Sequence, residues 1–157
     1  MKIRLLVIGK TEEEYLRNGI AAYESRIKRY IPFEIVELPA LKNASNIPLA
    51  GQKSREAALF HKLIQPGDLV VLLDENGKEM SSTAFSDFLN QRFLSGARSM
   101  NSLAGGPYGF DETLPKRADF ILSLSKMTFS HQMVRLFFTE QLYRALTILR
   151  GEPYHHA

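Results

Sequence analysis

The chain has 157 residues, of which 45% are hydrophobic and 24% charged. These are ordinary values for a soluble globular protein of one domain. No stretch approaches 18 consecutive apolar residues and no small-residue cleavage site follows the first apolar run, so we expect a cytoplasmic protein without a membrane segment. Cysteine is absent, which excludes disulfides, thiolate metal sites and reactions that need a cysteine nucleophile.

The net charge of +3 is unevenly distributed along the chain. Residues 1–30 and 112–157 carry more Lys and Arg than Asp and Glu, whereas residues 31–111 carry more acidic side chains. Basic ends favour an anionic partner. Solvated charge on helix faces would give the same pattern, so charge alone leaves both interpretations open.

The first half of the chain predicts two strands and two helices. Short apolar runs indicate strands, and longer runs with helical spacing indicate helices. The expected elements are a strand at 3–8, a helix from 11 to about 30, a strand at 33–38 and, after a loop, a helix at 51–64. Thr11 is the expected N-cap of the first helix, with Glu14 completing a capping box. Pro32 follows its end.

The second half continues the alternation. It predicts a strand at 69–73, a turn at 74–78, a helix capped by Ser81 or Ser82, a short strand running into a glycine loop within 102–110, a brief helix at 111–117, a strand at 120–124 and a helix at 131–149. Such alternation is typical of an α/β fold. We therefore expect one domain over residues 1–157, with a mostly parallel sheet flanked by helices.

The last helix, 131–149, is apolar around most of its circumference. Such a helix is expected to be buried on two sides, against its own sheet and against another subunit. Arg135 and Arg144 are nine positions apart and so point to different faces. One would reach RNA while the other faces a partner. Alternatively, Glu140, four residues before Arg144, makes a plain ion pair within the helix.

Three predicted strand ends carry unusual loops, at Leu73, Gly105 and Leu124. In open α/β sheets, ligands gather beyond the carboxyl ends of the strands, so one shared cleft is a candidate site; three ordinary turns are the competing interpretation. The loop at 105–109 fits neither the dinucleotide fingerprint nor a P-loop. No histidine or carboxylate spacing indicates a metal site. The tail Tyr154-His155 is either disordered or stacks on an unpaired base.

Taken together, these segments resemble the RlmH family of SPOUT RNA methyltransferases over essentially the whole chain. The motifs that carry the resemblance are Leu73-Asp-Glu-Asn-Gly-Lys78 with Ser81-Ser82, Gly105-Gly-Pro-Tyr-Gly109, Ser123-Leu-Ser-Lys-Met-Thr-Phe-Ser-His-Gln-Met133, Glu140-Gln-Leu-Tyr-Arg-Ala145 and Gly151-Glu-Pro-Tyr-His155. The resemblance implies a C-terminal trefoil knot, S-adenosylmethionine as cofactor and a homodimer. It also implies methylation of N3 of a pseudouridine in bacterial 23S ribosomal RNA of the large subunit, on the assembled ribosome, without a metal.

The same resemblance assigns roles to individual residues. The cofactor site would be lined by Leu73, Gly105, Leu124, Ser125, Lys126, Met127, Thr128 and Phe129. The catalytic residues would be Arg144, Tyr154 and His155. Arg144 or His155 would stabilise the anion that forms on the base and Tyr154 would hold the base, with His155 as general base the alternative.

This sequence departs from the family pattern at Ala104, Ser130 and His156, which affects local loop shape and one phosphate contact. Two other classes of protein remain as alternatives. One is a ribosome-associated protein that keeps the fold without the activity, and the other is a flavodoxin-like binder of flavin or nucleotide. Binding of S-adenosylmethionine separates the first from an enzyme, and affinity for ribosomes excludes the second.

Overall fold

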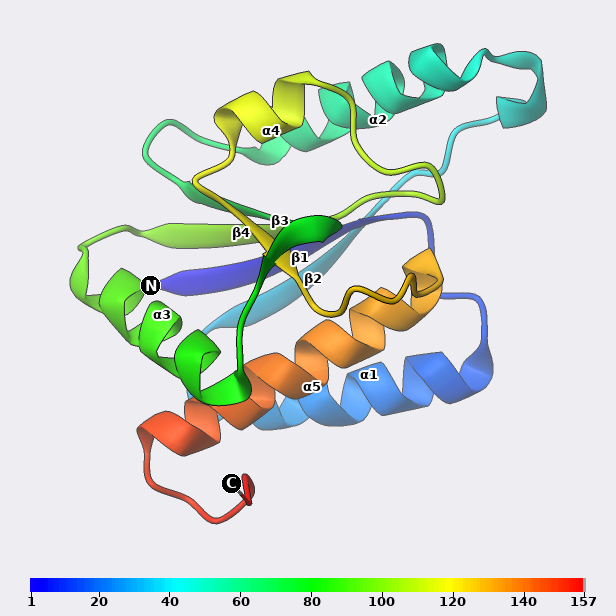
Figure 1. The fold of residues 1–157 in the computed structure, drawn as a ribbon. Helices are drawn as coiled ribbons and strands as arrows, with labels where there is room; N and C mark the ends of the chain where they lie inside the picture. Colours follow the sequence, from blue (N-terminus) through cyan, green and yellow to red (C-terminus); the bar gives the residue numbers. More distant parts are fainter. Residues whose placement is uncertain (157) are drawn as a thin grey trace.

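Five parallel strands form one sheet, and helices cover both of its faces (Figure 1). The computed structural model describes residues 1–156. The strands are β1 (Lys2–Ile8), β2 (Phe33–Leu38), β3 (Leu69–Glu79), β4 (Ser99–Ala104) and β5 (Phe120–Ser123), in the order β2-β1-β4-β3-β5. All neighbouring strands in this order pair in parallel. The predicted α/β fold with a mostly parallel sheet is confirmed.

The helices divide between the two faces. One face is covered by α1 (Glu14–Ile27), α3 (Ser82–Leu94) and α5 (His131–Leu149), and the other by α2 (Leu49–Leu63) and α4 (Thr113–Arg117) (Figure 1). A short 3₁₀ turn, Ala44–Asn46, precedes α2. Strand β1 supplies both cores because successive side chains of a strand point to opposite faces. Leu5 and Val7 join the core under α5, whereas Leu6 and Ile8 join the core under α2.

Helix α5 packs between α1 and α3, along the lower edge of the molecule in Figure 1. Phe138, Leu142 and Leu146 are buried in the core on this side of the sheet. Ser130 caps the helix by accepting a hydrogen bond from the Met133 N–H at 3.1 Å. Phe137 remains 37% exposed, so part of the apolar circumference of α5 lies uncovered in the single chain.

The predicted capping role of Thr11 is wrong. Helix α1 begins at Glu14 and its N-cap, Glu13, makes no side-chain cap bond. Thr11 is engaged elsewhere, since its N–H donates to Glu37 at 2.9 Å and its hydroxyl accepts from Arg135 at 3.1 Å. The helix ends at Ile27, three residues earlier than expected. A tertiary contact has therefore replaced the local cap that the sequence motif offers.

The predicted turn at 74–78 is also wrong. Strand β3 continues to Glu79, and its register against β5 shifts between Leu73 and Lys78. Gly77 lies so close to β5 that an added Cβ would come within 2.6 Å of the Ile121 carbonyl oxygen. The polar composition of this segment mimics a turn, but the glycine permits close strand packing. Strand β4 likewise begins at Ser99, three residues before the predicted start.

Candidate active site

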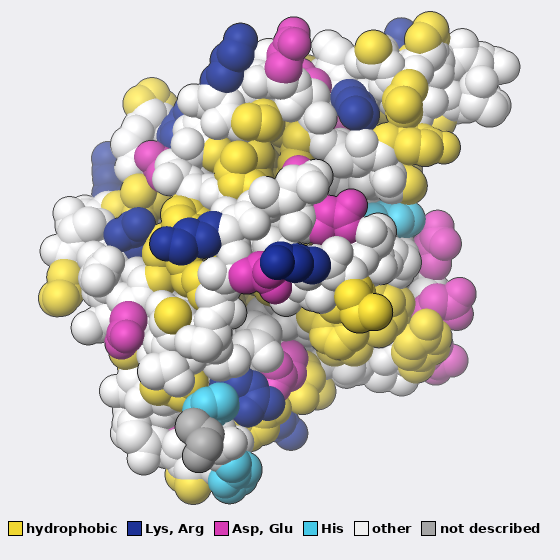
Figure 2. Space-filling model, viewed as in Figure 1, with side chains coloured by type: hydrophobic (Ala, Val, Ile, Leu, Met, Phe, Trp, Pro, Cys, Tyr) yellow, Lys and Arg dark blue, Asp and Glu magenta, His cyan; other side chains and the backbone are white. Residues whose placement is uncertain are grey.

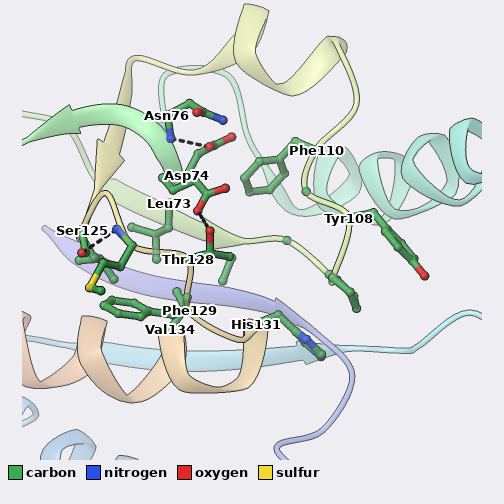
Figure 3. Close-up of a pocket in the computed structure, with 18 of the residues that line it drawn as sticks. Leu73, Asp74, Asn76, Tyr108, Phe110, Ser125, Thr128, Phe129, His131 and Val134 are labelled. Carbon is green, nitrogen blue, oxygen red and sulfur yellow. Dashed lines mark hydrogen bonds between the residues drawn. The ribbon is translucent and has the colours of Figure 1, made fainter.

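A cavity of about 400 Å³ lies where β4 and β5 end, beside the middle of β3 at Leu73–Asn76. Because the strands are parallel, their carboxyl ends share one edge of the sheet, and the loops that follow them meet there. Ser125 and Phe129 lie on one side of the cavity, and Tyr108 and His131 lie on the other (Figure 3). The shared cleft that the three loops predict is therefore present.

Seven of the eight residues predicted for the cofactor site line this cavity. They are Leu73, Gly105, Leu124, Ser125, Met127, Thr128 and Phe129. Lys126 is not among the lining residues. Its side chain is 87% exposed and its ammonium lies 3.7 Å from a carboxylate oxygen of Glu79. The structure thus brings together all of the predicted set except Lys126.

The loop that follows β5 is held in shape by its own hydrogen bonds. The Ser123 hydroxyl donates to the Ser125 carbonyl at 2.8 Å, and the Met127 N–H donates to the Ser125 hydroxyl at 3.0 Å. Thr128 donates to the carboxylate of Glu75, which ties this loop to the extension of β3. These bonds fix the backbone that forms one wall of the cavity.

The glycine loop after β4 forms the opposite wall. Gly109 donates its N–H to the Gly106 carbonyl at 3.1 Å and closes a tight turn with a positive φ of 82°. A Cβ on Gly105 would meet the Gly109 carbonyl oxygen at 3.2 Å, and one on Gly106 would meet Glu56 at 2.8 Å. Burial raises the pKa of Glu56, and a hydrogen bond from the Gly106 backbone opposes this rise.

Several lining residues were missed by the sequence motifs. Lys53 reaches the cavity from α2, and Asp74 and Glu75 reach it from β3. His131, at the start of α5, also lines it. Burial and the Arg135 cation lower the pKa of His131, which favours the neutral ring. Asp74, Glu75 and His131 belong to motifs that were singled out, so of these four residues only Lys53 lacked a signal beyond the chemistry of its side chain.

The three residues predicted to be catalytic form one hydrogen-bonded cluster. Glu140 accepts from the Arg144 Nη2 at 2.5 Å and from the Tyr154 hydroxyl at 3.0 Å. Arg144 Nη1 lies 3.1 Å from His155 Nδ1. The Arg144 guanidinium also lies over the Tyr154 ring, 4.7 Å from its centroid. The predicted ion pair within the helix is confirmed, and the tail is ordered against it.

This cluster has a defined electrostatic state. The hydrogen bond to Glu140 raises the pKa of Arg144, so the guanidinium stays charged. Burial, followed by hydrogen bonds with Tyr23 and Glu140, raises the pKa of Tyr154, so the phenol stays protonated. Arginine can only donate. In this contact His155 therefore accepts at Nδ1.

The cavity and the cluster lie at opposite ends of α5. Val134 lines the cavity near the start of the helix, whereas Arg144 lies near its end. Ten residues at 1.5 Å each separate them by about 15 Å along the helix axis. Within one chain, the predicted cofactor residues and the predicted catalytic residues are therefore not adjacent.

Arg135 has neither of the roles expected for an arginine on this helix. Its side chain is buried, with only 2% exposed. It donates to the carbonyl of Ile8 at 2.6 Å and to that of Gly9 at 2.9 Å. The expectation that Arg135 reaches RNA or a partner is wrong. Its guanidinium instead binds the carbonyls at the end of β1 and so holds this strand against α5.

Residues 1–156 contain no group of three His, Asp or Glu side chains placed to hold a metal ion. None of the helices in this range is both long and apolar enough to cross a bilayer.

Comparison with known proteins defines the class. A family described as predicted SPOUT methyltransferase matches residues 1–155. A probable methyltransferase from Bordetella pertussis Tohama I has the same fold, with a TM-score of 0.56 at 10% identity over 92% of this chain and 95% of that one. A probable methylase family protein from Haemophilus influenzae Rd KW20 gives 0.55 at 12% identity, over 95% of this chain and 66% of that one. The chain belongs to the SPOUT methyltransferase family.

Relatives with higher sequence identity define the family within the SPOUT class. The chain is 53% identical over 156 residues to Ribosomal RNA large subunit methyltransferase H of Christiangramia forsetii and 51% identical to that of Parabacteroides distasonis, with 99% of each chain covered. Within the SPOUT class the chain is thus a member of the family of Ribosomal RNA large subunit methyltransferase H. The resemblance to the RlmH family is confirmed.

Proposed function

We propose that this protein transfers a methyl group from S-adenosylmethionine to N3 of a pseudouridine in bacterial 23S ribosomal RNA, on the assembled ribosome in the cytoplasm. The observation that carries the proposal is its membership, over nearly its full length, in a family whose curated members are named ribosomal RNA large subunit methyltransferases. The meeting of the loops after β4 and β5 with the extension of β3 around one cavity supports it. A trefoil knot formed by the C-terminal loops belongs to the same proposal.

The cavity has the size and chemistry that S-adenosylmethionine needs. Its volume lies within the range of small-molecule sites. Leu73, Leu124 and Phe129 offer apolar surface to an adenine ring, and Gly105 and Gly106 permit the tight loop that forms the opposite wall, because a Cβ at either position would crowd Gly109 or Glu56. The carboxylates of Asp74 and Glu75 and the ammonium of Lys53 match a ligand that carries both signs of charge. Together with Ser125, Met127 and Thr128, these residues would hold the cofactor; Lys126 would contribute at the rim.

The bound cofactor supplies a methyl group on a positively charged sulfur, and its transfer forms the N3–carbon bond, breaks the sulfur–carbon bond and releases the proton of N3 to water. N3 is a weakly acidic imide nitrogen, so the protein must stabilise the base as it loses that proton. The Arg144 cation and the Nε2–H of His155 supply positive charge and a donor for this purpose. Tyr154 stays protonated and holds the base. Because Nδ1 of His155 already accepts from Arg144, His155 is better placed to donate to the base through Nε2 than to act as the general base.

The enzyme is proposed to act as a homodimer. One chain places its cavity and its catalytic cluster at opposite ends of α5, so the reaction needs a second copy to bring the two together. A second hollow of about 320 Å³ adjoins the cavity at Phe129. It is lined by apolar side chains that include Phe85 and Phe137, together with Ser81, Ser82, Ser123 and Gln141. An uncovered apolar face beside the site suits a twofold contact with the same face of another copy.

Transfer of a labelled methyl group to ribosomes from cells that lack this protein tests the function. Wild-type protein is expected to label the large-subunit RNA, and Arg144→Ala and Gly105→Val are each expected to lose the activity. Mixing the two inactive variants as unfolded chains and refolding them is expected to restore about a quarter of the activity, because half of the dimers then hold one intact site of two. Full activity in both Arg144→Ala and His155→Ala would refute the catalytic assignment, and no recovery on mixing would refute the composite site.

A further inference from the structure

Four of the six tyrosines gather at one end of the molecule. The ring of Tyr143 lies 4.7 Å from Tyr154, 5.9 Å from Tyr23 and 6.1 Å from Tyr30, measured between centroids. The hydroxyls of Tyr23 and Tyr154 are 3.2 Å apart. We call these four side chains the tyrosine ladder. They come from the end of α1, the end of α5 and the tail, which the fold brings together below the sheet (Figure 1).

Three arginines are stacked on the tyrosine ladder. Arg26 lies over two of its rings, at 5.4 and 5.5 Å from their centroids, and Arg144 and Arg150 each lie 4.7 Å from the centroid of one ring. Stacking on an aromatic face holds a guanidinium flat and leaves the donors at its edge free. Arg26 and Arg150 are exposed, so these donors face solvent. At the lower end of the face drawn in Figure 2, histidine and Lys or Arg side chains lie side by side.

The charges around the ladder favour an anion. Of the three neighbouring carboxylates, Glu140 pairs with Arg144 and Glu24 lies 3.9 Å from Lys28, whereas Glu152 accepts only from the neutral hydroxyl of Tyr30 at 2.5 Å and keeps its charge. Within residues 1–156, no carboxylate lies within 4.0 Å of the guanidinium nitrogens of Arg26 or Arg150. The two exposed cations therefore outnumber the one neighbouring carboxylate, Glu152, that no cation in the described part of the chain pairs with.

We propose that the tyrosine ladder and its arginines form the surface on which a single-stranded segment of the RNA substrate lies. This inference rests on the proposed function and deepens it. The free edges of Arg26 and Arg150 would bind phosphates on either side of the target nucleotide. Their flat faces and the tyrosine rings would stack with unpaired bases, which is how proteins bind unpaired RNA. Arg144, the third arginine of the same ladder, reaches the base that is modified.

The test measures binding of the intact dimer to purified large ribosomal subunits from cells lacking the protein, by co-sedimentation at several salt concentrations. In Arg26→Ala/Arg150→Ala, the dissociation constant at 0.1 M salt is expected to rise about 25-fold, roughly fivefold for each lost phosphate contact, and the salt dependence is expected to become shallower. Lysine at both positions keeps the charge without the stacked geometry, so the Arg26→Lys/Arg150→Lys variant is expected to recover part of the affinity.

Arg92→Ala is the matched control, because Arg92 is also stacked on an aromatic ring, 4.2 Å from the centroid of Phe88, but lies on α3. It is expected to bind like the wild type. The surface is refuted if the Arg26/Arg150 alanine variant binds as tightly as this control, because the arginines would then only pack α1 against α5. The wild-type protein could bind the subunits in a way that depends on both arginines and yet transfer no methyl group. This result would support the RNA-binding surface and refute the proposed reaction.

Discussion

Replacing Arg135 by methionine is expected to weaken the junction between β1 and α5. Arg135 is buried, and its guanidinium makes three hydrogen bonds, to the carbonyls of Ile8 and Gly9 and to the hydroxyl of Thr11. Methionine keeps much of the volume but none of the donors. The two carbonyls at the end of β1 would then lose a charged partner, the one at Ile8 in a buried contact and the one at Gly9 in a partly buried one.

The magnitude follows from these contacts. A buried carbonyl left without a partner costs about 1–3 kcal/mol, whereas the Thr11 hydroxyl can turn to another partner. Methionine also removes the desolvation penalty of the buried guanidinium, which is the penalty that lowers the pKa of Arg135. This gain offsets part of the loss in the free energy of unfolding. The net loss expected in the free energy of unfolding is about 2–4 kcal/mol. For a chain of this length, that corresponds to a fall in Tm of about 4–16 °C.

Urea unfolding at one fixed protein concentration measures this difference, since the stability of the proposed dimer would depend on concentration. Arg55→Met is the control, because Arg55 is exposed on α2, and it is expected to change stability by less than about 0.5 kcal/mol. An Arg135→Met variant as stable as Arg55→Met would refute the account, because the buried bonds would then contribute nothing net.

Three further predictions concern the sheet, the cavity and the cluster. Gly77→Ala is expected to lower the free energy of unfolding by about 1–3 kcal/mol, since the new methyl would overlap the Ile121 carbonyl; an unchanged urea midpoint would contradict this. The lowered pKa of His131 means that its contribution to stability is complete above the ordinary pKa of 6.5 and is lost as the pH falls through the folded-state value. His131→Asn should therefore lose less stability than the wild type on acidification below pH 6.5, and parallel profiles would exclude the effect. Glu140→Ala should slow methyl transfer about 10- to 100-fold by releasing Arg144, without weakening cofactor binding; equal rates would show that Arg144 needs no such support.

Much of the fold was predictable because it depends on local patterns. The apolar runs of β1, β3 and β5 and the alternation with helices predict a parallel sheet, and Ser81, one of the two predicted caps, caps the helix that follows it. The shared cleft was also predictable, because carboxyl ends of parallel strands meet at one edge. Resemblance to the family added the particular residues of the cavity wall.

The remaining features depend on contacts between distant parts of the chain. Thr11 carries a capping motif, yet the partner that displaces the cap, Arg135, lies 124 residues away. The segment 74–78 has the composition of a turn, and only the proximity of Ile121 shows why Gly77 belongs to a strand. The hydroxyls of Tyr23 and Tyr154 meet across 131 positions. Local propensity carries no information on such pairings.

The central claim is that this chain methylates N3 of a pseudouridine in large-subunit RNA. The most direct measurement is mass spectrometry of the nucleosides released from large subunits that lacked the modification and were then treated with the protein and S-adenosylmethionine. The account predicts one new nucleoside, N3-methylpseudouridine, which is absent after treatment with Arg144→Ala. Folded protein that binds the cofactor and the subunits but leaves every pseudouridine unmethylated would contradict it.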